Sequence, residues 1–538
     1  MTGERAGWSR YQLIVAVALL TTAAGNAAFF GKVMAVWPPG PQTAVPLLAL
    51  AVAFAAVSTL LLTLFAIGPL LRPLLILWLQ IAAFAAYFMD SFGVVINTEM
   101  LDNAVQTQAA EARDLFSLRL LAYWLVLGIV PGIVVWRLRL RRDGWLRALA
   151  ARALLAGGCV AVIASCVLGQ GGFFASFIRE HKPLRSYANP AYPIYSAVRY
   201  ADSRWVDAGE GPVARIAEDA RVRAADPHRE FIVLVVGETA RADRFSLNGY
   251  ARPTNPELSR EAVFSYRNVR SCGTSTAVSV PCMFSLLGQA DFDVKSARRQ
   301  ENLLDIIQRA GAAVLWLDNN SDSKGVALRV PYENYRTPDR NPSCDGECRD
   351  EGMLGRVRAF ADSQPTGDIV VVLHAMGNHG PAYYKRYPPA FEKFVPACHD
   401  NDLSRCSAEE ISNAYDNAIL YTDHFLAQVI ALLKDYDDRF ETAMVYFSDH
   451  GESLGEGGTW LHGLPLAIAP ESQTHIPAVF WFGRGFDDVA PDKLRQARDA
   501  ALNHDHLAHT IMGMLEIETR SYRRELDLLA DYRPEDWQ

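Results

Sequence analysis

Residues 231 to 238 read FIVLVVGE, and this segment determines the class of the C-terminal fold. Its first six residues are all apolar, and four of them are Val or Ile. A continuous apolar run of this kind is typical of a strand that is buried on both faces of a sheet. The sequence therefore predicts that a soluble domain starts at residue 231, with Gly237 and Glu238 directly after its first strand.

Four further apolar runs of strand length follow, at AAVLWL (312–317), DIVVVLH (368–374), TAMVYF (442–447) and HIPAVFWF (475–482). Segments with apolar residues at helical spacing lie between them, at 302–311 and 412–436. Strands that alternate with helices indicate an α/β domain with a mainly parallel sheet. We expect this domain to occupy residues 231–538.

Polar residues that can bind a metal follow several of these runs. They are Glu238 after the first, His374 and His379 after the third, and Ser448, Asp449 and His450 after the fourth, and His462 follows further on. Functional groups of an open α/β sheet gather at the carboxyl ends of its strands. A single Asp-His pair is more often a hydrogen-bonded turn, but the mixture of nitrogen and oxygen ligands from separate strands suits catalytic zinc.

The N-terminal third has the composition of a membrane domain. Five stretches without charges are long enough to cross a bilayer, at about 11–31, 45–68, 73–93, 118–136 and 153–174. The first is too long for the core of a cleaved signal peptide, and other spans follow it directly. We expect a five-span transmembrane domain at 1–178 and an interfacial helix with a linker at 179–230, where SYANPAYPIYSAVRY is rich in aromatic residues.

The orientation of these spans follows from the segment RLRLRRDGWLR at 137–147. Short loops rich in Arg and Lys stay in the cytoplasm, and this segment joins the fourth and fifth spans. The N-terminus is then cytoplasmic, with Arg5, Arg10 and Arg72 on the same side, and the soluble domain is periplasmic. The alternative is a solvated helix face, which the position between two apolar runs disfavours.

The cysteines agree with a periplasmic location. Six lie in the soluble part as three close pairs: Cys272 and Cys282, Cys344 and Cys348, and Cys398 and Cys406. This arrangement predicts three short disulfide loops in an oxidising compartment. Metal-binding thiolates are the alternative, but the segments CGTSTAVSVPC and CDGEC lack a repeated C-x-x-C pattern. Cys159 and Cys166 fall within the fifth span.

Two polar segments carry candidate functional side chains. In SCGTSTAVSVPCMFS (271–285), the hydroxyls of Thr274, Ser275, Thr276 and Ser279 are candidate nucleophiles that zinc could activate, and the sequence does not choose among them. The alternative is a surface loop with a structural disulfide. In the loop at 94–117, Asn103, Thr107 and Glu111 recur every four residues, as on one face of a helix, which a solvated loop helix would equally explain.

Net charge limits the class of partner. The formal net charge is −8, with 52 basic and 60 acidic residues, and no concentrated basic surface is evident. Nucleic-acid binding is therefore not expected.

Several long segments resemble the lipid A phosphoethanolamine transferases, a family that includes the mobile colistin-resistance enzymes and is part of the alkaline phosphatase/sulfatase-like superfamily. They are VVGETARADRFSLNGY, SCGTSTAVSVPCMFS, LHAMGNHGPAYYKRYP and FSDHGESLGE followed by LHG. The resemblance covers nearly the whole chain. CDGEC encloses only three residues where the loop of the family can be longer, which affects local loop shape and not chemistry.

The resemblance implies roles for individual residues. The positions that match the zinc ligands are Glu238, Thr276, Asp449 and His450, and Thr276 matches the nucleophile. His379 and His462 match residues that contact phosphoethanolamine and can hold additional zinc, while His374 and Lys324 match substrate-site positions. Asn103, Thr107 and Glu111 match residues implicated in recognition of phosphoethanolamine.

The resemblance also implies a reaction. Thr276 would take phosphoethanolamine from phosphatidylethanolamine and pass it to a phosphate of lipid A, with His379 as a base, in the inner membrane of a Gram-negative bacterium. Polymyxin resistance would result, and we expect a monomer surrounded by membrane lipids. The alternatives are transfer to another cell-envelope glycan, a related phosphoglycerol transferase, a sulfatase, which would need a C/S-x-P-S/A-x-R segment that is absent around Thr276, and a receptor without catalytic activity.

Overall fold

The computed structural model describes residues 7–65, 67–106, 115–141, 144–179, 181–207, 212–223, 228–487 and 489–533. The chain divides into two compact units. The first comprises residues 1–101 and 116–204 and is the membrane unit, and the second comprises residues 102–115 and 205–538 and is the catalytic unit.

Within the described part of the membrane unit, four helical segments are long and apolar enough to cross a bilayer: α3 (Ala44–Phe65), η1 with α4 (Gly68–Leu70 and Leu71–Phe92), α7 to α8 (Leu118–Arg137) and α9 (Trp145–Gly169). The third of these contains a π-helical stretch, η2 (Trp124–Ile129), between α7 (Leu118–Tyr123) and α8 (Val130–Arg137). A bent pair, α1 (Arg10–Ala24) and α2 (Ala27–Val36), makes a fifth span if it is counted as one. Five spans agree with the sequence-based prediction.

The first span differs from the predicted continuous helix because it bends by 56° between α1 and α2. Buried amide side chains hold this break. Asn26 Nδ2 donates to the carbonyls of Thr21 and Asn189, and Asn189 Nδ2 donates to the carbonyl of Gly25, all at 2.7–2.8 Å. A break in an apolar helix leaves backbone groups without helical partners, and these side chains satisfy some of them.

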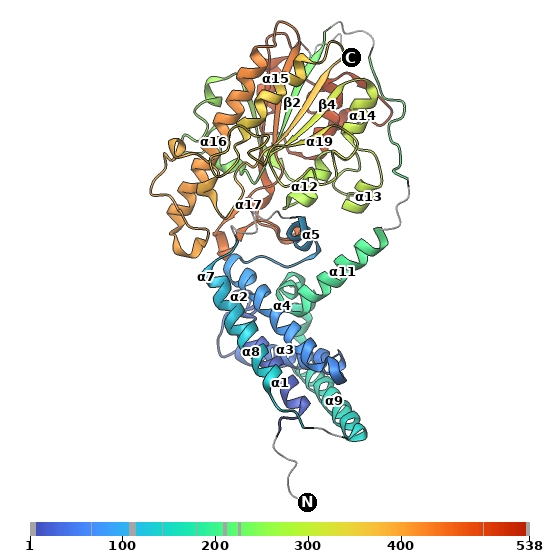
Figure 1. Cartoon of the computed structure of the whole chain (residues 1–538), viewed down its shortest axis with the longest axis vertical. Helices are drawn as coiled ribbons and strands as arrows, with labels where there is room; N and C mark the ends of the chain where they lie inside the picture. The colour runs from blue at the N-terminus through green and yellow to red at the C-terminus, as the bar shows by residue number, and fades with distance from the viewer. Residues whose placement is uncertain are drawn as a thin grey trace, which may run out of the picture. The chain divides into compact units, whose positions relative to one another are not determined.

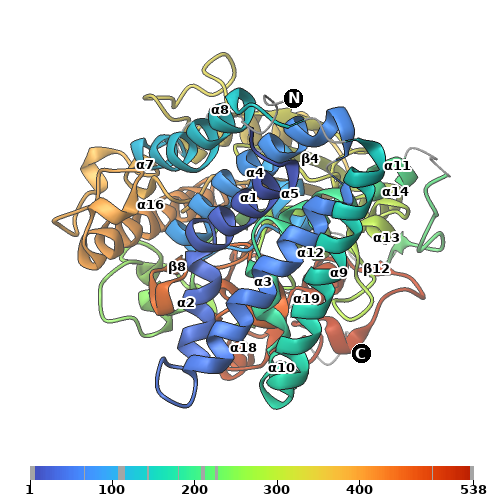
Figure 2. The same cartoon turned by 90° about the horizontal axis from the view of Figure 1, so that it is seen from below.

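The last span starts earlier than predicted. Helix α9 begins at Trp145, so Arg147 and Arg152 of the Arg-rich segment belong to its first turns, and it ends at Gly169. Figure 2 shows α9 alongside α3, against which it packs. Helix α10 (Gly171–Arg179), η3 (Lys182–Tyr187) and α11 (Ala191–Asp207) follow, and α11 supplies a helix in the predicted interfacial segment.

The polar loop after α4 forms a short helix, α5 (Thr98–Gln106), that carries Asn103. Thr107 and Glu111 lie outside the described residues. The predicted alignment of the three side chains on one helix face therefore stays a prediction.

The catalytic unit is built on a mainly parallel sheet, as the alternation of strands and helices predicts (Figure 1). Among the described residues its strand order is β11 (Leu502–Asn503), β3 (Phe264–Arg270), β10 (His475–Phe482), β7 (Glu441–Ser448), β2 (Glu230–Gly237), β6 (Ile369–His374), β4 (Ala313–Asp318) and β5 (Tyr332–Asn334). The five strands from β7 to β5 are parallel to one another. Strand β10 is antiparallel to both of its neighbours, so its start, not its end, lies at the edge where the parallel strands end.

Helices cover both faces of this sheet (Figure 1). Ile232, Leu234 and Val236 of β2 belong to the same core as residues of α12 (Thr276–Met283), α14 (Leu303–Ala310) and α19 (Asp505–Met514). Phe231 faces the other way and packs against the rings of Tyr436 and Phe440, which follow α16 (Ala408–Lys434). Helix α15 (Leu354–Asp362) packs beside α16. This alternation explains why the strands read as continuous apolar runs.

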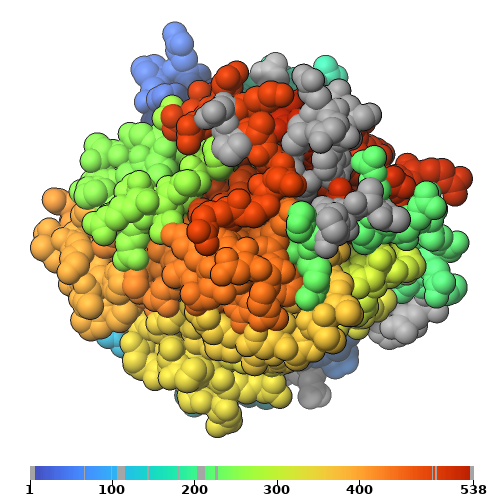
Figure 3. Space-filling model, turned by 90° about the horizontal axis from the view of Figure 1, so that it is seen from above, coloured from blue at the N-terminus to red at the C-terminus, as the bar shows by residue number. Residues whose placement is uncertain are grey.

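The remaining elements are short. Pairs of two-residue strands form β1 (Arg221–Val222) with β12 (Ile517–Glu518) and β8 (Ser453–Leu454) with β9 (Trp460–Leu461). Helix α13 (Val294–Arg298) follows α12 in the chain, and α17 (Glu471–Thr474) precedes β10. Figure 3 shows that one face of the catalytic unit combines segments that are far apart in the sequence, from green residues through yellow and orange to red.

Candidate active site

The side chains that gather at the site continue one face of the sheet. The neighbouring strands β7, β2, β6 and β4 each place a side chain near their carboxyl ends in the core on the α12 face: Phe447, Val236, Val372 and Trp316. Side chains two positions apart along a strand point to the same face. Two positions further on, these strands therefore align Asp449, Glu238, His374 and Asp318, all fully buried.

The hydroxyl of Thr276 meets this row. Its Oγ1 donates to Glu238 Oε2 at 3.0 Å and lies 3.5 Å from His450 Nε2. His450 Nε2 is 3.5 Å from Glu238 Oε1 and 3.3 Å from Asp449 Oδ2. The ligand atoms of Glu238, Asp449 and His450 all lie within 4.8 Å of one another, as a metal site requires.

A fixed loop presents Thr276. It is the first residue of α12, and the disulfide between Cys272 and Cys282 closes the segment around it. The other candidate hydroxyl with a described partner, Thr274 Oγ1, donates to the carbonyl of Leu464 at 2.6 Å. Cys272 N–H donates to His504 Nδ1 at 3.2 Å, which anchors the loop from outside. Of the four candidate hydroxyls, the structure brings that of Thr276 into contact with Glu238 and His450.

The electrostatics of the group favour a cation. Burial, with a smaller effect from the charge of His462, holds the pKa of His450 well below its ordinary value, so its ring is neutral and can ligate a metal. Burial raises the pKa of Asp449 to about 6. Asp449 Oδ2 is buried and accepts no hydrogen bond among the described residues. A divalent metal would stabilise this carboxylate, and a set of carboxylate, hydroxyl and imidazole ligands fits zinc.

Two further histidines lie beside this group. The ring centroids of His462 and His450 are 4.4 Å apart, and those of His462 and His379 are 5.4 Å apart. Burial and then the charge of His462 hold the pKa of His379 well below its ordinary value. Glu452 accepts from Tyr383 Oη at 2.7 Å and lies 2.8 Å from His462 Nδ1, which orients the His462 ring.

The other predicted substrate residues lie on separate elements. Lys324 is in the loop after β4, where Nζ donates to the carbonyl and the hydroxyl of Ser321 at 2.9 and 2.7 Å. His374 is the last residue of β6 and belongs to the row on the α12 face. Asn103 lies on α5, while Thr107 and Glu111 fall outside the described residues.

The sequence-based reasoning missed the residues after β4. Asn320 Nδ2 donates to Glu238 Oε2 and to the carbonyl of Ala375, both at 2.8 Å, so it fixes a proposed metal ligand. Asp318 pairs with His374 at 2.8 Å. Both residues directly follow the apolar run 312–317, and the rule that points to Glu238 and Asp449 also points to them. Glu452 had no comparable signal because it belongs to an irregular segment after β7.

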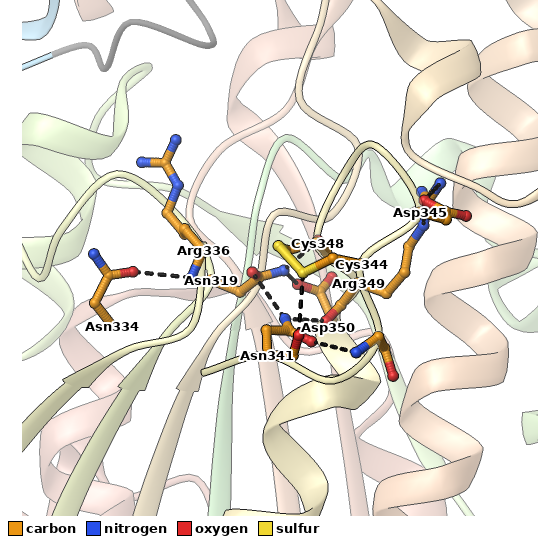
Figure 4. Close-up of a disulfide and its surroundings, with 10 residues drawn as sticks. Asn319, Asn334, Arg336, Asn341, Cys344, Asp345, Cys348, Arg349 and Asp350 are labelled. Carbon is orange, nitrogen blue, oxygen red and sulfur yellow. Dashed lines mark hydrogen bonds and ion pairs between the residues drawn. A yellow bond between two sulfur atoms is a disulfide. The ribbon is translucent and has the colours of Figure 1, made fainter. Parts of the chain in front are cut away.

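The predicted pairs of cysteines form disulfides, at Cys272–Cys282, Cys344–Cys348 and Cys398–Cys406. Figure 4 shows that the short Cys344–Cys348 loop is tied to the strand ends. Asn319 Nδ2 donates to the carbonyl of Cys348 at 2.9 Å and to Asp350 Oδ1 at 2.7 Å. Asp350 Oδ1 also accepts from the backbone N–H of Met376 at 2.8 Å, in the segment between His374 and His379.

Comparison with protein families gives two matches that together span most of the chain. Residues 54–205 match the family described as phosphoethanolamine transferase EptA/EptB, and residues 230–517 match the sulfatase family. The chain is 41% identical to phosphatidylethanolamine transferase Mcr-1 of Escherichia coli over 522 residues, which cover 95% of both chains. It is 37% identical to phosphoethanolamine transferase EptA of Escherichia coli K12, with 94% of both chains covered.

Solved structures agree with this assignment. The integral membrane protein lipooligosaccharide phosphoethanolamine transferase A (EptA) of Neisseria meningitidis matches with a TM-score of 0.92 and 36% identity, over 97% of this chain and 98% of that chain. The separate soluble domain of the same enzyme matches with a TM-score of 0.58 and 42% identity, over 60% of this chain and 99% of that domain. The chain therefore belongs to the EptA/EptB phosphoethanolamine transferases, within the alkaline phosphatase-like superfamily.

Proposed function

We propose that this protein transfers phosphoethanolamine from phosphatidylethanolamine to a phosphate of lipid A through a covalent intermediate on Thr276. The observation that carries the proposal is the contact of the Thr276 hydroxyl with Glu238 and His450, at 3.0 and 3.5 Å. The relatives that match nearly the whole chain are named phosphatidylethanolamine transferase and phosphoethanolamine transferase, which supports the donor and the group transferred.

Zinc is the proposed cofactor, held by Glu238, Thr276, Asp449 and His450. The neutral ring of His450 and the buried Oδ2 of Asp449 support this ligand set. When bound, zinc lowers the pKa of a coordinated hydroxyl and offsets negative charge on a phosphoryl oxygen. His379 and His462, whose rings are 5.4 Å apart, are the proposed ligands of an additional zinc ion.

In the first step, the Thr276 oxygen forms a bond to the phosphorus of phosphatidylethanolamine. The hydroxyl proton leaves toward Glu238 Oε2, which already accepts it in a hydrogen bond. The bond from phosphorus to the diacylglycerol oxygen breaks, and diacylglycerol leaves after it gains a proton. A nucleophile that forms a covalent intermediate divides one difficult transfer into two easier ones.

In the second step, a phosphate oxygen of lipid A attacks the phosphorus, and the bond to Thr276 breaks. His379 is the proposed base that takes a proton from the entering phosphate. Burial keeps its ring neutral, which leaves a nitrogen lone pair for this role. Product release regenerates the Thr276 hydroxyl.

Seven residues are proposed to bind the phosphoethanolamine group: Asn103, Thr107, Glu111, Lys324, His374, His379 and His462. His379 and His462 lie next to the proposed metal ligands, and His374 shares their sheet face. The ammonium group of Lys324 would offset phosphoryl charge.

The apolar helices make the chain an integral membrane protein, and its disulfide-bonded catalytic unit suits the periplasm. We propose that the N-terminus is cytoplasmic, because the Arg-rich segment 137–147 lies between two spans. We further propose that the protein acts as a monomer and that the transferred group lowers the affinity of the outer membrane for polymyxins.

Expression in a polymyxin-sensitive Escherichia coli host that lacks this modification tests the function. Mass spectrometry of extracted lipid A should show the addition of one phosphoethanolamine group, and polymyxin tolerance should rise. The Thr276→Ala variant, at equal abundance in the membrane, should give unmodified lipid A. Unmodified lipid A with the wild-type protein, or the mass of a phosphoglycerol group, would contradict the proposal.

A further inference from the structure

Asp318 and His374 form a buried pair beside the proposed metal ligands. They end the neighbouring parallel strands β4 and β6, where they are register partners. Oδ2 of Asp318 lies 2.8 Å from Nδ1 of His374, and neither side chain is exposed to solvent. The pair therefore lies one strand beyond Glu238 in the row of polar side chains that ends the α12 face.

The surroundings of Asp318 fix the direction of this hydrogen bond. Its Oδ2 also accepts from Trp316 Nε1 at 2.9 Å, and its Oδ1 accepts from the backbone N–H groups of Asn320 and Asp322 at 3.0 and 3.2 Å. All of these partners are donors, so the carboxyl group must be an acceptor at both oxygens. Burial pushes the pKa of Asp318 up, but the charge of His374 and these hydrogen bonds together hold it below its ordinary value. Asp318 is ionised, and the proton lies on His374 Nδ1.

The other ring nitrogen of His374 is directed to a different set of groups. Nε2 is buried and has no hydrogen-bond partner among the described residues. His374 is on the same sheet face as Glu238 and Asp449, and its charge influences Asp449. A buried polar atom without a partner is costly, and a ligand oxygen or nitrogen would satisfy it.

We propose that Asp318 is a positioning residue for the transfer reaction. It holds His374 with the proton on Nδ1, so that Nε2 is the atom that contacts the transferred phosphoethanolamine group. This inference rests on the proposed function and deepens it, because it names the atom of His374 that meets the substrate and the residue that orients it. A carboxylate that orients a histidine through its other nitrogen typically changes activity by about 10- to 100-fold in metal sites.

Substitution of Asp318 by Asn tests the proposal. An Asn amide must place its NH₂ group either against Trp316 and His374 or against the two backbone N–H groups, and every one of these partners is a donor. We expect Asp318→Asn in the full-length protein to lower kcat for transfer by about 10- to 100-fold. Zinc content and melting temperature should remain those of the wild type. Asp438→Asn, at a side chain that is 95% exposed, is the matched control and should keep wild-type transfer.

A double-mutant cycle separates positioning from a structural effect. If Asp318 acts through His374, Asp318→Asn should have no further effect on kcat in a His374→Ala background. Two variants that leave Asp318 intact test the contact atom. The amide nitrogen of His374→Asn replaces Nδ1 alone, whereas that of His374→Gln replaces Nε2, so the Asn variant should be as slow as His374→Ala and the Gln variant faster.

Three results would overturn the proposal: wild-type kcat in Asp318→Asn, an equal loss from this change in the His374→Ala background, or equal rates in the Asn and Gln variants. Each presumes that the wild-type protein transfers phosphoethanolamine. Failure of the proposed function is a separate result, in which the wild type itself transfers no more than Thr276→Ala.

Discussion

Thr276 Oγ1 donates a hydrogen bond to Glu238 Oε2 at 3.0 Å, although 38 positions separate the two residues. This contact joins the start of α12 to the end of β2. It distinguishes Thr276 from the neighbouring hydroxyls, because Thr274 is bound to the carbonyl of Leu464. The site thus depends on a loop with a fixed shape as well as on the ends of parallel strands.

Loss of a proposed metal ligand should remove zinc and activity together. We expect Asp449→Asn to release zinc and to lower transfer by at least about 100-fold, since the neutral amide is a weaker ligand. Elemental analysis of purified protein gives the zinc content. Glu471→Gln is the control, because the Glu471 side chain is 66% exposed and pairs with Arg270 at the surface. Full zinc occupancy in Asp449→Asn would exclude Asp449 from the ligand set.

The Cys272–Cys282 disulfide should matter more for activity than the Cys398–Cys406 disulfide. Both close short loops, of 10 and 8 residues separation, but only the first encloses Thr276. Removal of either disulfide by paired Cys→Ser changes should cost about 2–3 kcal/mol of unfolding free energy. At a temperature where both variants remain folded, transfer should fall by at least about tenfold more in the first. Equal activities would show that the loop does not position Thr276.

Stability should decrease as the pH falls, and His504 should contribute to this decrease. Its Nδ1 accepts from Cys272 N–H, and burial lowers its pKa from 6.5 to about 4. The unfolded chain therefore binds this proton more readily than the folded protein. The contribution vanishes above about pH 6.5 and grows to a loss of about 3 kcal/mol as the pH falls to about 4.

The His504→Asn variant isolates this group. Asn can still accept from Cys272 N–H, but it does not titrate. Melting temperatures measured between pH 7 and pH 4 should fall less steeply for the variant than for the wild type. Parallel pH profiles would rule out His504 as a source of the pH dependence.

The catalytic unit alone should fold but transfer poorly to lipid A. The soluble domain of the Neisseria meningitidis relative was solved by itself, which supports independent folding of residues 205–538. Both proposed substrates are lipids, and tethering at the bilayer raises their effective concentration. We expect the isolated unit to bind zinc and to lose most transfer in an assay with membrane vesicles. Transfer equal to that of the full-length protein would show that the membrane unit is dispensable.

The strands of the sheet centre could be predicted from sequence because they are buried on both faces. FIVLVV and TAMVYF are apolar at every position or nearly so, and both form strands at the expected residues. Strand β3, FSYRNVR, was not predicted, because its burial alternates and several of its residues are polar. Its place beside β10 depends on pairing with a distant segment, which local pattern does not reveal.

The proposed site was predictable in part for a similar reason. Glu238 and Asp449 directly follow strands, and the topology of a parallel sheet brings such residues together. The contact between His462 and Glu452 could not be inferred, because it lies in irregular backbone after β7. Nor does any periodic pattern identify Thr276 among four hydroxyls. That choice required the resemblance to a family, and in the structure it rests on the closed loop and the start of α12.

The most direct test of the account is detection of the covalent intermediate. Full-length protein should be incubated with phosphatidylethanolamine without lipid A, digested, and analysed by tandem mass spectrometry. The account predicts a phosphoethanolamine adduct on Thr276 that disappears when lipid A is added and never forms in Thr276→Ala. An adduct on another residue, or transfer to lipid A by the Thr276→Ala protein at the wild-type rate, would contradict it.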